Sequence, residues 1–480
     1  MKLNKFLASF LFFALCLAPV RLYPQNVRTG RSLLETQLAA LPGVTEVFRM
    51  ESTEFQEKYS IRVRQMVKPG DIIYGFFEQR VFVMHRGYDR PTVFVTEGYG
   101  ANYAANPRYA DELSKIFEAN LVVVEHRYFG ESVPSPRRWE HLNGPNAMHD
   151  LHVIREALKT LYKGKWIATG ISKGGQTAMM YRTLYPNDVD ITVCYVAPLC
   201  VSARDDRHAR FISTKAGTPE SRKQVLEFQK EVLQRRDSLM PLFTAFCDSA
   251  GLSFSRPVEE IFDYCVLEYS FAFWQWGTKP ETIPGSKADD KEVFAHFMQI
   301  AAPDYFVRDT PTLPFFIQAA KELGYYTYHT EPFRYKVERT RFVLAKEKKK
   351  WFKKKKDNEE EEDEGTPVVK GEWVTKKHPA MELKNAKNYL KVLFLPDFYK
   401  PGFKKSLYNQ QSRFIKETDA KMVFIYGEWD PWTAAAVPNP DKPNILYYVE
   451  PGGSHRARIG TLPESMRQSL IEQMNNWLNE

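Results

Sequence analysis

One serine is flanked by glycines in an arrangement that suits nucleophilic chemistry. Ser172 lies in Gly170-Ile-Ser-Lys-Gly174, after the apolar run Trp166–Ala168 and before a predicted helix over Gln176–Tyr185. A strand that reverses sharply into a helix leaves such a serine at the tip of a strained turn, and the glycines avoid collisions with neighbouring backbone. The backbone N–H of Lys173 then lies at the helix N-terminus, where an oxyanion can form. An ordinary Gly-rich turn is the alternative for this motif alone.

An acid and a histidine follow this serine in the order that a nucleophile elbow of this type requires, which is serine, acid, histidine. Asp430 stands at the end of an apolar strand that begins at Met422. His455 is the only histidine after it and follows a predicted strand over 445–449. His455 would take the proton of Ser172, and Asp430 would orient the imidazole.

Each of these residues also has an ordinary structural explanation when it is taken alone. Asp430 precedes Pro431 and suits a turn, Glu428 competes with it for the acid role, and His455 suits a plain loop. The chain order and the positions at strand ends together favour a Ser172–Asp430–His455 triad.

Composition predicts a globular protein and excludes several functional classes. The 480 residues are 43% hydrophobic and 14% aromatic, which suits one large decorated domain or two domains. The net charge of +8, from 67 basic and 59 acidic residues, gives little support for nucleic-acid binding. The sequence contains no P-loop and no Cys/His cluster with metal spacing, so we expect neither a cofactor nor a metal.

The N-terminus has the pattern of a secretory signal peptide over residues 1–24. Lys2 and Lys5 precede an apolar run over 6–20, which is too short for a comfortable membrane span. We expect cleavage between Ala18 and Gln25 and export to the periplasm or the extracellular space. Leu15 precedes Cys16 where a lipoprotein would have a small residue, so a lipid anchor is disfavoured, and no other segment is apolar enough to span a membrane.

An exported chain can form disulfides between its remaining cysteines. These are Cys194, Cys200, Cys247 and Cys265. Cys247 and Cys265 are close in sequence and are the preferred pair, whereas Cys194 lies in a predicted core strand and suits a buried thiol.

The order of predicted elements indicates an α/β fold. Alternating strands between 45 and 90 are followed by buried strands at 92–96, 121–126, 166–168 and 191–197, with helices between them. Strands that alternate with helices predict a parallel sheet covered on both faces. We therefore predict an α/β-hydrolase with a mostly parallel central sheet, whose core is formed by residues 25–201 and 409–480.

A long insertion separates the two parts of this core. Helical patterns dominate 202–408, for example at 221–236 and 258–275, and predict a large helical cap over the serine. Within it, the charged segment 346–364 consists of a lysine block followed by a glutamate block and is predicted to be an exposed loop or charged hairpin.

Further residues are candidates for the oxyanion hole and for substrate binding. The loop Glu97-Gly-Tyr-Gly100 follows a strand, so Tyr99 or Gly100 is expected to supply a second oxyanion N–H. His126 and Arg127 are expected to hold a loop below the site. In the cap, an aromatic run could line a pocket for an apolar ring such as proline, and an acid could pair with a substrate amine. These substrate-binding candidates are Phe273, Trp274 and Trp276, with Glu268 or Glu97 as the acid. A cap core is the alternative for the aromatic side chains.

Several stretches together resemble one peptidase family. They are Val124–Ser132 (VEHRYFGES), Gly170–Gly175, Glu268–Gly277, Gly427–Trp432 (GEWDPW) and Gly452–His455. In order and spacing they are similar to the secreted bacterial tripeptidyl aminopeptidases and their relatives, the lysosomal Pro-Xaa carboxypeptidase and dipeptidyl peptidase II. The resemblance implies an α/β-hydrolase with a helical cap, the Ser172–Asp430–His455 triad, and a peptidase that often favours proline. Lys173 departs from the aromatic residue of the eukaryotic relatives.

The sequence thus predicts an exported serine exopeptidase that releases short peptides, most readily tripeptides, from the N-terminus of oligopeptides. An esterase or lipase of the same fold is one alternative, and a dipeptidyl peptidase or Pro-Xaa carboxypeptidase is another. A catalytically dead hydrolase fold used for binding is the alternative from a different class. The oligomeric state remains open.

Overall fold

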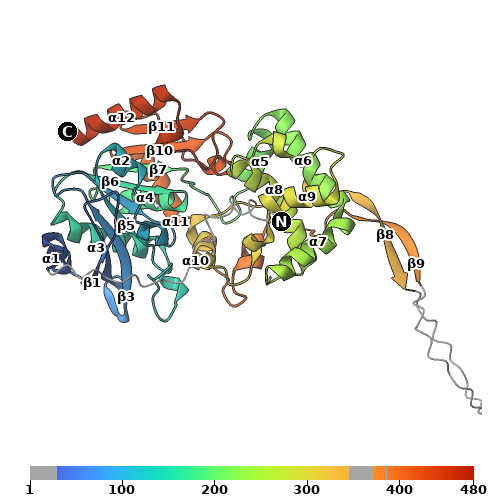
Figure 1. Cartoon of the computed structure of the whole chain (residues 1–480), viewed down its shortest axis with the longest axis horizontal. Helices are drawn as coiled ribbons and strands as arrows, with labels where there is room; N and C mark the ends of the chain where they lie inside the picture. Colours follow the sequence, from blue (N-terminus) through green and yellow to red (C-terminus); the bar gives the residue numbers. More distant parts are fainter. Residues whose placement is uncertain (1–29, 345–370, 385) are drawn as a thin grey trace, which may run out of the picture.

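The computed structural model describes residues 30–344, 371–384 and 386–480. The expected signal peptide over 1–24, with Cys16, and the charged segment over 346–364 lie outside the described residues. The described chain forms an α/β part with a twisted sheet and a second, largely helical part beside it (Figure 1).

A nine-stranded sheet of order β1-β2-β3-β5-β4-β6-β7-β10-β11 organises the α/β part. The first three strands are antiparallel, β3 is antiparallel to β5, and the six strands from β5 to β11 run parallel. The strands are β1 Val44–Met50, β2 Glu57–Lys68, β3 Asp71–His85, β4 Thr92–Thr96, β5 Asn120–Val124, β6 Trp166–Ile171, β7 Ile191–Tyr195, β10 Lys421–Gly427 and β11 Ile445–Glu450. The expected mostly parallel central sheet is confirmed, and the strands expected between residues 45 and 90 form its antiparallel beginning.

The central strands are buried on both faces, which explains their unbroken apolar runs. Side chains alternate across a strand, so Val93 and Val95 of β4 face one core while Phe94 faces the other. The first core is covered by α2 Glu112–Ile116 and α12 Glu464–Asn479, and the second by α1 Leu33–Ala39 and α3 Gly144–Lys159. Both α4 Lys173–Leu184 and α11 Ser406–Glu417 pack against the sheet next to them.

The second part is inserted between β7 and β10 and forms a cap with its own aromatic core. Its helices are α5 Arg207–Thr214, α6 Pro219–Gln234, α7 Arg236–Ser249, α8 Val258–Gln275, α9 Asp290–Ile300 and α10 Leu313–Gln318. Besides the expected helices, the insertion contains two antiparallel strands, β8 Lys336–Leu344 and β9 Gly371–Pro379, which project from the cap in Figure 1. At the predicted boundary near residue 408, α11 begins at Ser406 and packs on α4 of the α/β part and on the segment Ala319–Leu323 of the insertion.

The segment after β5 is held by two buried ion pairs. The Glu125 carboxylate pairs with Arg80 and accepts hydrogen bonds from the Ala101 N–H (2.9 Å) and the Ser132 hydroxyl (2.9 Å). The Arg127 guanidinium binds both oxygens of Asp150, at 2.6 and 2.7 Å. Two parallel bonds fix the orientation of both groups. These residues therefore tie the loop to the sheet and to α3, in agreement with the holding role expected for Arg127.

The expected disulfide between Cys247 and Cys265 is absent from the structure. All four described cysteines are buried thiols. Cys247 lies on α7 and Cys265 on α8, and both pack in the cap core as small apolar side chains. Among the described residues, no helix is both long and apolar enough to span a membrane.

We expect the Arg127–Asp150 pair to be a major determinant of stability. Replacing Arg127 by Met leaves the buried Asp150 carboxylate without its partner, which costs about 3–5 kcal/mol of unfolding free energy. Arg90 pairs with Glu118 at an exposed site, so Arg90→Met is a matched control that costs less than about 1 kcal/mol. Urea denaturation of both variants measures the difference. Equal losses would contradict this assignment.

Candidate active site

Ser172 occupies a strained turn between β6 and α4. Its backbone has φ 57° and ψ −119°, a left-handed conformation that non-glycine residues rarely adopt. The Ser172 N–H donates to the Tyr195 carbonyl (2.9 Å) of the neighbouring strand, and the Ser172 carbonyl accepts from the Gln176 N–H (2.8 Å) of the helix. These bonds hold the turn from both sides and leave the serine half-exposed. The expected elbow is present in the structure.

The turn is possible because three glycines let backbone segments approach closely. A Cβ on Gly170 would lie 2.3 Å from the Gly174 carbonyl, and one on Gly175 would lie 2.8 Å from the Tyr195 carbonyl oxygen. A Cβ on Gly98 would lie 2.7 Å from the Lys173 Cβ. Gly174 is less tightly enclosed, since its nearest neighbour would be the Thr96 carbonyl oxygen at 3.2 Å. The sequence motif alone did not indicate the roles of Gly98 and Gly175.

Asp430 and His455 form a buried pair at the carboxyl edge of the same sheet. The His455 Nδ1 lies 2.6 Å from the Asp430 Oδ2, and the other carboxylate oxygen accepts the Trp432 N–H at 3.0 Å. Asp430 is fully buried and His455 is 5% exposed. Because Asp430 is held on both oxygens, it can fix the imidazole with Nε2 directed away from the pair.

The remaining imidazole nitrogen is available for proton transfer. The His455 Nε2 is buried and has no hydrogen-bond partner among the described residues. Trp276 stands edge-on to the imidazole, at 6.2 Å between ring centroids, and the Trp432 ring lies at 6.3 Å. The His455 N–H donates to the Gln275 carbonyl (2.9 Å) at the end of α8, so the cap contributes to placing the histidine loop.

The expected oxyanion residues lie together above the N-terminus of α4. Lys173 is the first residue of that helix, so its N–H lies in the first turn, where backbone donors have no intrahelical acceptor. The side chain of Lys173 is buried, and its Nζ donates to the Gly98 carbonyl at 2.5 Å. Tyr99 and Gly100 follow directly, and the Tyr99 carbonyl accepts the His126 N–H (3.1 Å).

Glu97 folds back onto its own loop. Its carboxylate accepts the N–H of Gly98 (3.2 Å), a backbone hydrogen bond from Tyr99 and the hydroxyl of Tyr103. Burial raises the pKa of Glu97 to about 6, although these hydrogen bonds and the Lys173 charge act in the opposite direction. The Tyr99 N–H expected for an oxyanion is thus directed at this carboxylate, which would have to be displaced before it could serve.

Glu268 lies in the cap and is joined to the His455 region by a row of aromatic rings. Its carboxylate accepts the hydroxyls of Tyr326 (2.9 Å) and Tyr328. Burial raises the pKa of Glu268 to about 7, while the two hydroxyls lower it. Tyr326 stacks on Phe271 at 3.8 Å, and both rings contact Trp432 at 5.4 Å between centroids. We call Trp432, Phe271, Tyr326 and Tyr328 the aromatic wall.

Phe273 and Trp274, two of the expected substrate-binding residues, lie in the buried cap core, and the rings of the aromatic wall belong to the same core. Phe273 packs against Trp274 there, and the Trp274 ring fills the space over Gly217. Trp276, half-buried beside His455, keeps its place near the site. The aromatic wall was missed, although the run Tyr325-Tyr-Thr-Tyr328 was visible in the sequence.

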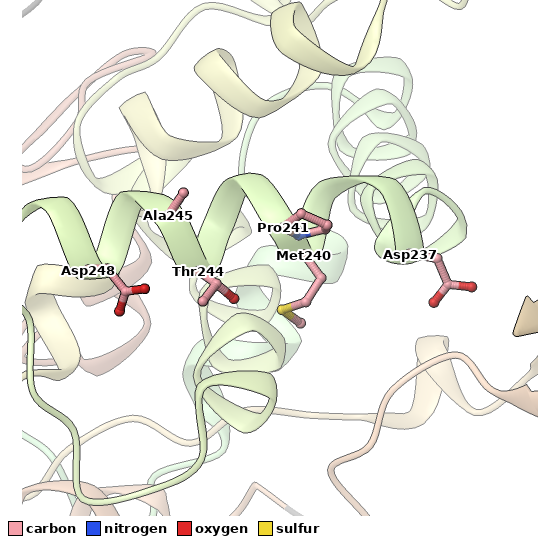
Figure 2. Close-up of a pocket in the computed structure, with 6 residues that line it drawn as sticks. All are labelled: Asp237, Met240, Pro241, Thr244, Ala245 and Asp248. Carbon is pink, nitrogen blue, oxygen red and sulfur yellow. The ribbon is translucent and has the colours of Figure 1, made fainter. Parts of the chain in front are cut away.

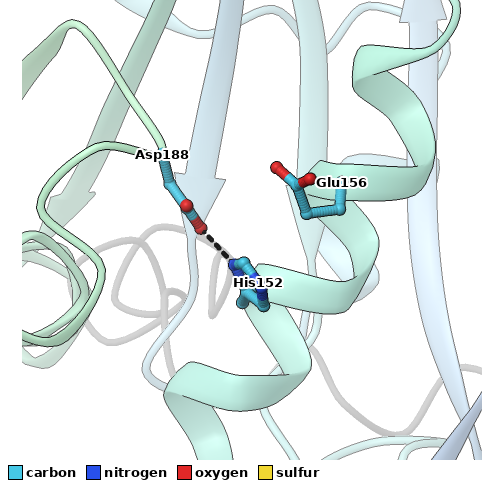
Figure 3. A group of neighbouring side chains, drawn as sticks. All are labelled: His152, Glu156 and Asp188. Carbon is cyan, nitrogen blue, oxygen red and sulfur yellow. Dashed lines mark hydrogen bonds and ion pairs between the residues drawn. The ribbon is translucent and has the colours of Figure 1, made fainter.

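Two other features lie outside this site. A hollow on the outer face of α7 is lined by residues of that helix alone (Figure 2), namely Asp237, Met240, Pro241, Thr244, Ala245 and Asp248. The side chains of His152, Glu156 and Asp188 gather between α3 and the turn after α4 (Figure 3). Asp188 already accepts hydrogen bonds from His152 (2.7 Å) and Tyr181 (2.5 Å), which accounts for this cluster without a metal.

Comparison with known proteins identifies related sequences. A family model described as PS-10 peptidase S37 matches residues 33–346. The prolyl tri/tetrapeptidyl aminopeptidase of Streptomyces mobaraensis is 28% identical over 418 residues, which cover 84% of this chain and 76% of that protein. The prolyl carboxy peptidase like protein 5 of Caenorhabditis elegans is 30% identical over 139 residues, or 26% of this chain and 27% of that protein.

A structural comparison gives more distant likenesses. The proline iminopeptidase of Mycobacterium smegmatis matches with a TM-score of 0.35 and 11% identity, covering 86% of this chain and 98% of that one. The structure of VinJ matches with a TM-score of 0.36 and 10% identity, covering 91% and 99%.

Asp430 rather than Glu428 is expected to support the histidine. Asp430→Asn removes the carboxylate charge and, with the amide oxygen kept at the Trp432 N–H, turns an NH2 donor toward the His455 Nδ1, which favours the wrong imidazole tautomer; we expect the rate of reaction with a serine-directed phosphonate to fall about 1,000- to 10,000-fold. Glu428 is exposed, and its carboxylate accepts the Gly452 N–H at 2.7 Å. Glu428→Gln is therefore the matched control, and we expect this variant to keep most of the rate of phosphonate reaction. If Glu428→Gln were the more damaging change, the acid would be misassigned.

Proposed function

The chain belongs to the PS-10 peptidase S37 family, and on that premise we propose that it is a serine exopeptidase that releases tripeptides from free N-termini. The buried Asp430–His455 pair at the same sheet edge as the strained Ser172 turn is the observation that carries the proposal. Membership of a serine peptidase family is established by the sequence match. The triad, the direction of cleavage and the length of the product are the proposed parts.

In the proposed mechanism, Ser172 attacks the substrate carbonyl carbon. The Nε2 of His455 accepts the serine proton and later gives a proton to the leaving amine, and Asp430 holds the imidazole and stabilises its charged form. The Lys173 N–H at the start of α4 binds the developing oxyanion, assisted by the positive end of the helix dipole. Water then attacks the acyl-enzyme by the same steps in reverse.

The aromatic residues beside the histidine support an apolar ring at the cleavage point. The rings of Trp276 and Trp432 both lie near His455, at 6.2 and 6.3 Å between ring centroids. The similar Streptomyces enzyme carries the word prolyl in its name. A proline ring packed against such surfaces would present its carbonyl to Ser172, so we propose a preference for proline before the cleaved bond.

Glu268 is proposed to anchor the substrate amine. A buried carboxylate recognises an ammonium group through charge-assisted hydrogen bonds, which are stronger than neutral ones. The aromatic wall leads from His455 through Trp432 and Tyr326 to this carboxylate. An acid at the end of the wall favours an amine over a carboxylate as the recognised terminus, and so favours aminopeptidase over carboxypeptidase action.

The position of Glu268 on α8 supports a tripeptide product. Gln275, whose carbonyl holds the His455 N–H, lies roughly two helical turns further along α8, about 10 Å from Glu268 along the axis. An extended chain advances about 3.3–3.6 Å per residue. The length of three extended residues matches this axial interval between Gln275 and Glu268, which supports a tripeptide product.

Export remains the second part of the proposal. It rests on the basic residues and the apolar run within residues 1–24, which have the pattern of a signal peptide. An enzyme placed outside the cytoplasm would meet oligopeptides in the periplasm or the medium.

Glu268→Gln should remove recognition of the free amine but leave the chemistry intact. We expect kcat/KM for Ala-Ala-Pro-p-nitroanilide with a free N-terminus to fall about 10- to 100-fold, because a hydrogen bond to a charged group is lost. Hydrolysis of a short acyl ester should be unchanged. Glu97→Gln is the matched control for the second candidate acid. If Glu97→Gln abolished the preference for the free-amine peptide over the ester and Glu268→Gln did not, Glu97 would be the anchor for the amine. The tripeptide length inferred from the position of Glu268 would then be wrong.

The same assignment predicts a distinctive pH dependence. Because burial raises the pKa of Glu268 to about 7, the free enzyme loses this carboxylate charge as the pH falls through 7. A peptide α-amino group loses its own charge above about pH 8. Both substrates depend on the groups that act in acyl transfer, so dividing kcat/KM for the free-amine peptide by kcat/KM for the ester isolates recognition of the amine. This ratio should peak between about pH 7 and 8. A ratio that is flat across this range in the wild-type enzyme would contradict the role of Glu268.

A further inference from the structure

Lys173 carries a buried ammonium group immediately after the proposed nucleophile. Only 3% of the residue is exposed, and its Nζ donates to the Gly98 carbonyl oxygen at 2.5 Å. The ammonium also lies over the faces of Tyr99 (5.5 Å) and Phe129 (5.3 Å), measured to the ring centroids. Burying a lysine is costly unless the charge is well paired, so this arrangement needs an explanation beyond that of an ordinary surface lysine.

The Lys173 side chain and backbone meet the same loop. This loop packs closely against Lys173 and the Gly174 N–H because Gly98 has no Cβ. A Cβ on Gly98 would lie 2.7 Å from the Lys173 Cβ and 2.8 Å from the Gly174 nitrogen. The carbonyl of Gly98 and the N–H of Tyr99 belong to one planar peptide group. A cation held at the oxygen of that peptide fixes its orientation and makes its N–H a stronger donor.

We propose that the Lys173 side chain is a positioning residue for the oxyanion hole, because its ammonium clamps the Gly98–Tyr99 peptide beside Ser172. Lys173 would then act through its own N–H as an oxyanion donor, and through its side chain on the Gly98–Tyr99 peptide, whose N–H becomes the second donor when the oxyanion displaces the Glu97 carboxylate. The Glu97 carboxylate bound at the Gly98 and Tyr99 N–H groups shows that these donors can hold an anion. This inference rests on the proposed function, since it takes Ser172 as the nucleophile.

The charges around Lys173 make the clamp sensitive to pH. Burial lowers the pKa of Lys173 to about 7, although Glu97 from the same loop and Glu322 from the cap raise it. His126, from the segment after β5, also faces the ammonium, and burial and the charge of Lys173 both lower the pKa of that histidine. As the pH rises through 7, Lys173 loses its charge and the Gly98 carbonyl is held more weakly. The clamp should therefore weaken above neutral pH.

Lys173→Met tests the clamp because it keeps the length of the side chain and removes the charge. With a short acyl ester as substrate, we expect kcat to fall about 100-fold while KM changes by less than about threefold, as for a displaced oxyanion donor. Lys58 is a buried lysine whose Nζ donates to the Asn106 carbonyl (2.8 Å), away from the turn, so Lys58→Met is the matched control. It should lower thermal stability but keep kcat. If Lys173→Met kept kcat within about threefold, or lost no more than Lys58→Met, the proposal would be wrong.

The pH profile of kcat for the ester separates a clamp from a merely structural role. The wild-type enzyme should lose activity above about pH 7, whereas Lys173→Arg, which stays charged, should keep its activity there. The same alkaline loss in a folded Lys173→Arg variant would overturn the proposal. Ser172→Ala, assayed in parallel, tests the function itself: residual ester hydrolysis would refute the nucleophile, and this inference with it. With Ser172→Ala inactive, a normal Lys173→Met variant would refute the clamp alone.

Discussion

The structure depends on the close approach of three backbone segments at the N-terminus of α4. Gly98, Gly170 and Gly175 lie where any Cβ would collide with neighbouring atoms. This contact forces Ser172 into its left-handed conformation and buries Lys173 behind it. The strain at the serine is sustained by one hydrogen bond to the Tyr195 carbonyl of β7 and one from the Gln176 N–H of α4. A strained backbone conformation persists only where the surrounding structure holds it in place. Here the six parallel strands of the sheet provide that rigid surrounding.

The cap and the α/β part meet through the residues around the histidine. The Gln275 carbonyl at the end of α8 holds the His455 loop, and Trp432, two residues after the proposed acid, belongs to the aromatic core of the cap. Substrate recognition by Glu268 and proton transfer by His455 would thus be set by one helix. A shift of α8 would change both, which gives the cap a direct route to catalytic rate as well as to specificity.

Sequence patterns predicted the elements whose burial follows a simple rule. The strands at 92–96 and 191–197 and the turn at Ser172 were expected because a strand buried on both faces has an unbroken apolar run and an elbow needs glycines. The roles of the cap residues were harder to predict, because the sequence does not indicate whether an aromatic residue on a helix faces the core or a ligand. Phe273 and Trp274 are buried in the cap core, and so are Tyr326 and Tyr328, which are distant in sequence and donate their hydroxyls to Glu268. Cys247 and Cys265 remain thiols, because closeness in sequence does not set the geometry that a disulfide needs.

The most direct test of this account is a crystal structure of the enzyme with a peptidyl phosphonate, Ala-Ala-Pro with a free amine. We expect a covalent bond from phosphorus to the Ser172 Oγ, a phosphonyl oxygen at the Lys173 N–H, and the amine at the Glu268 carboxylate. An adduct on another residue, or an amine bound at Glu97 or left in solvent, would contradict it.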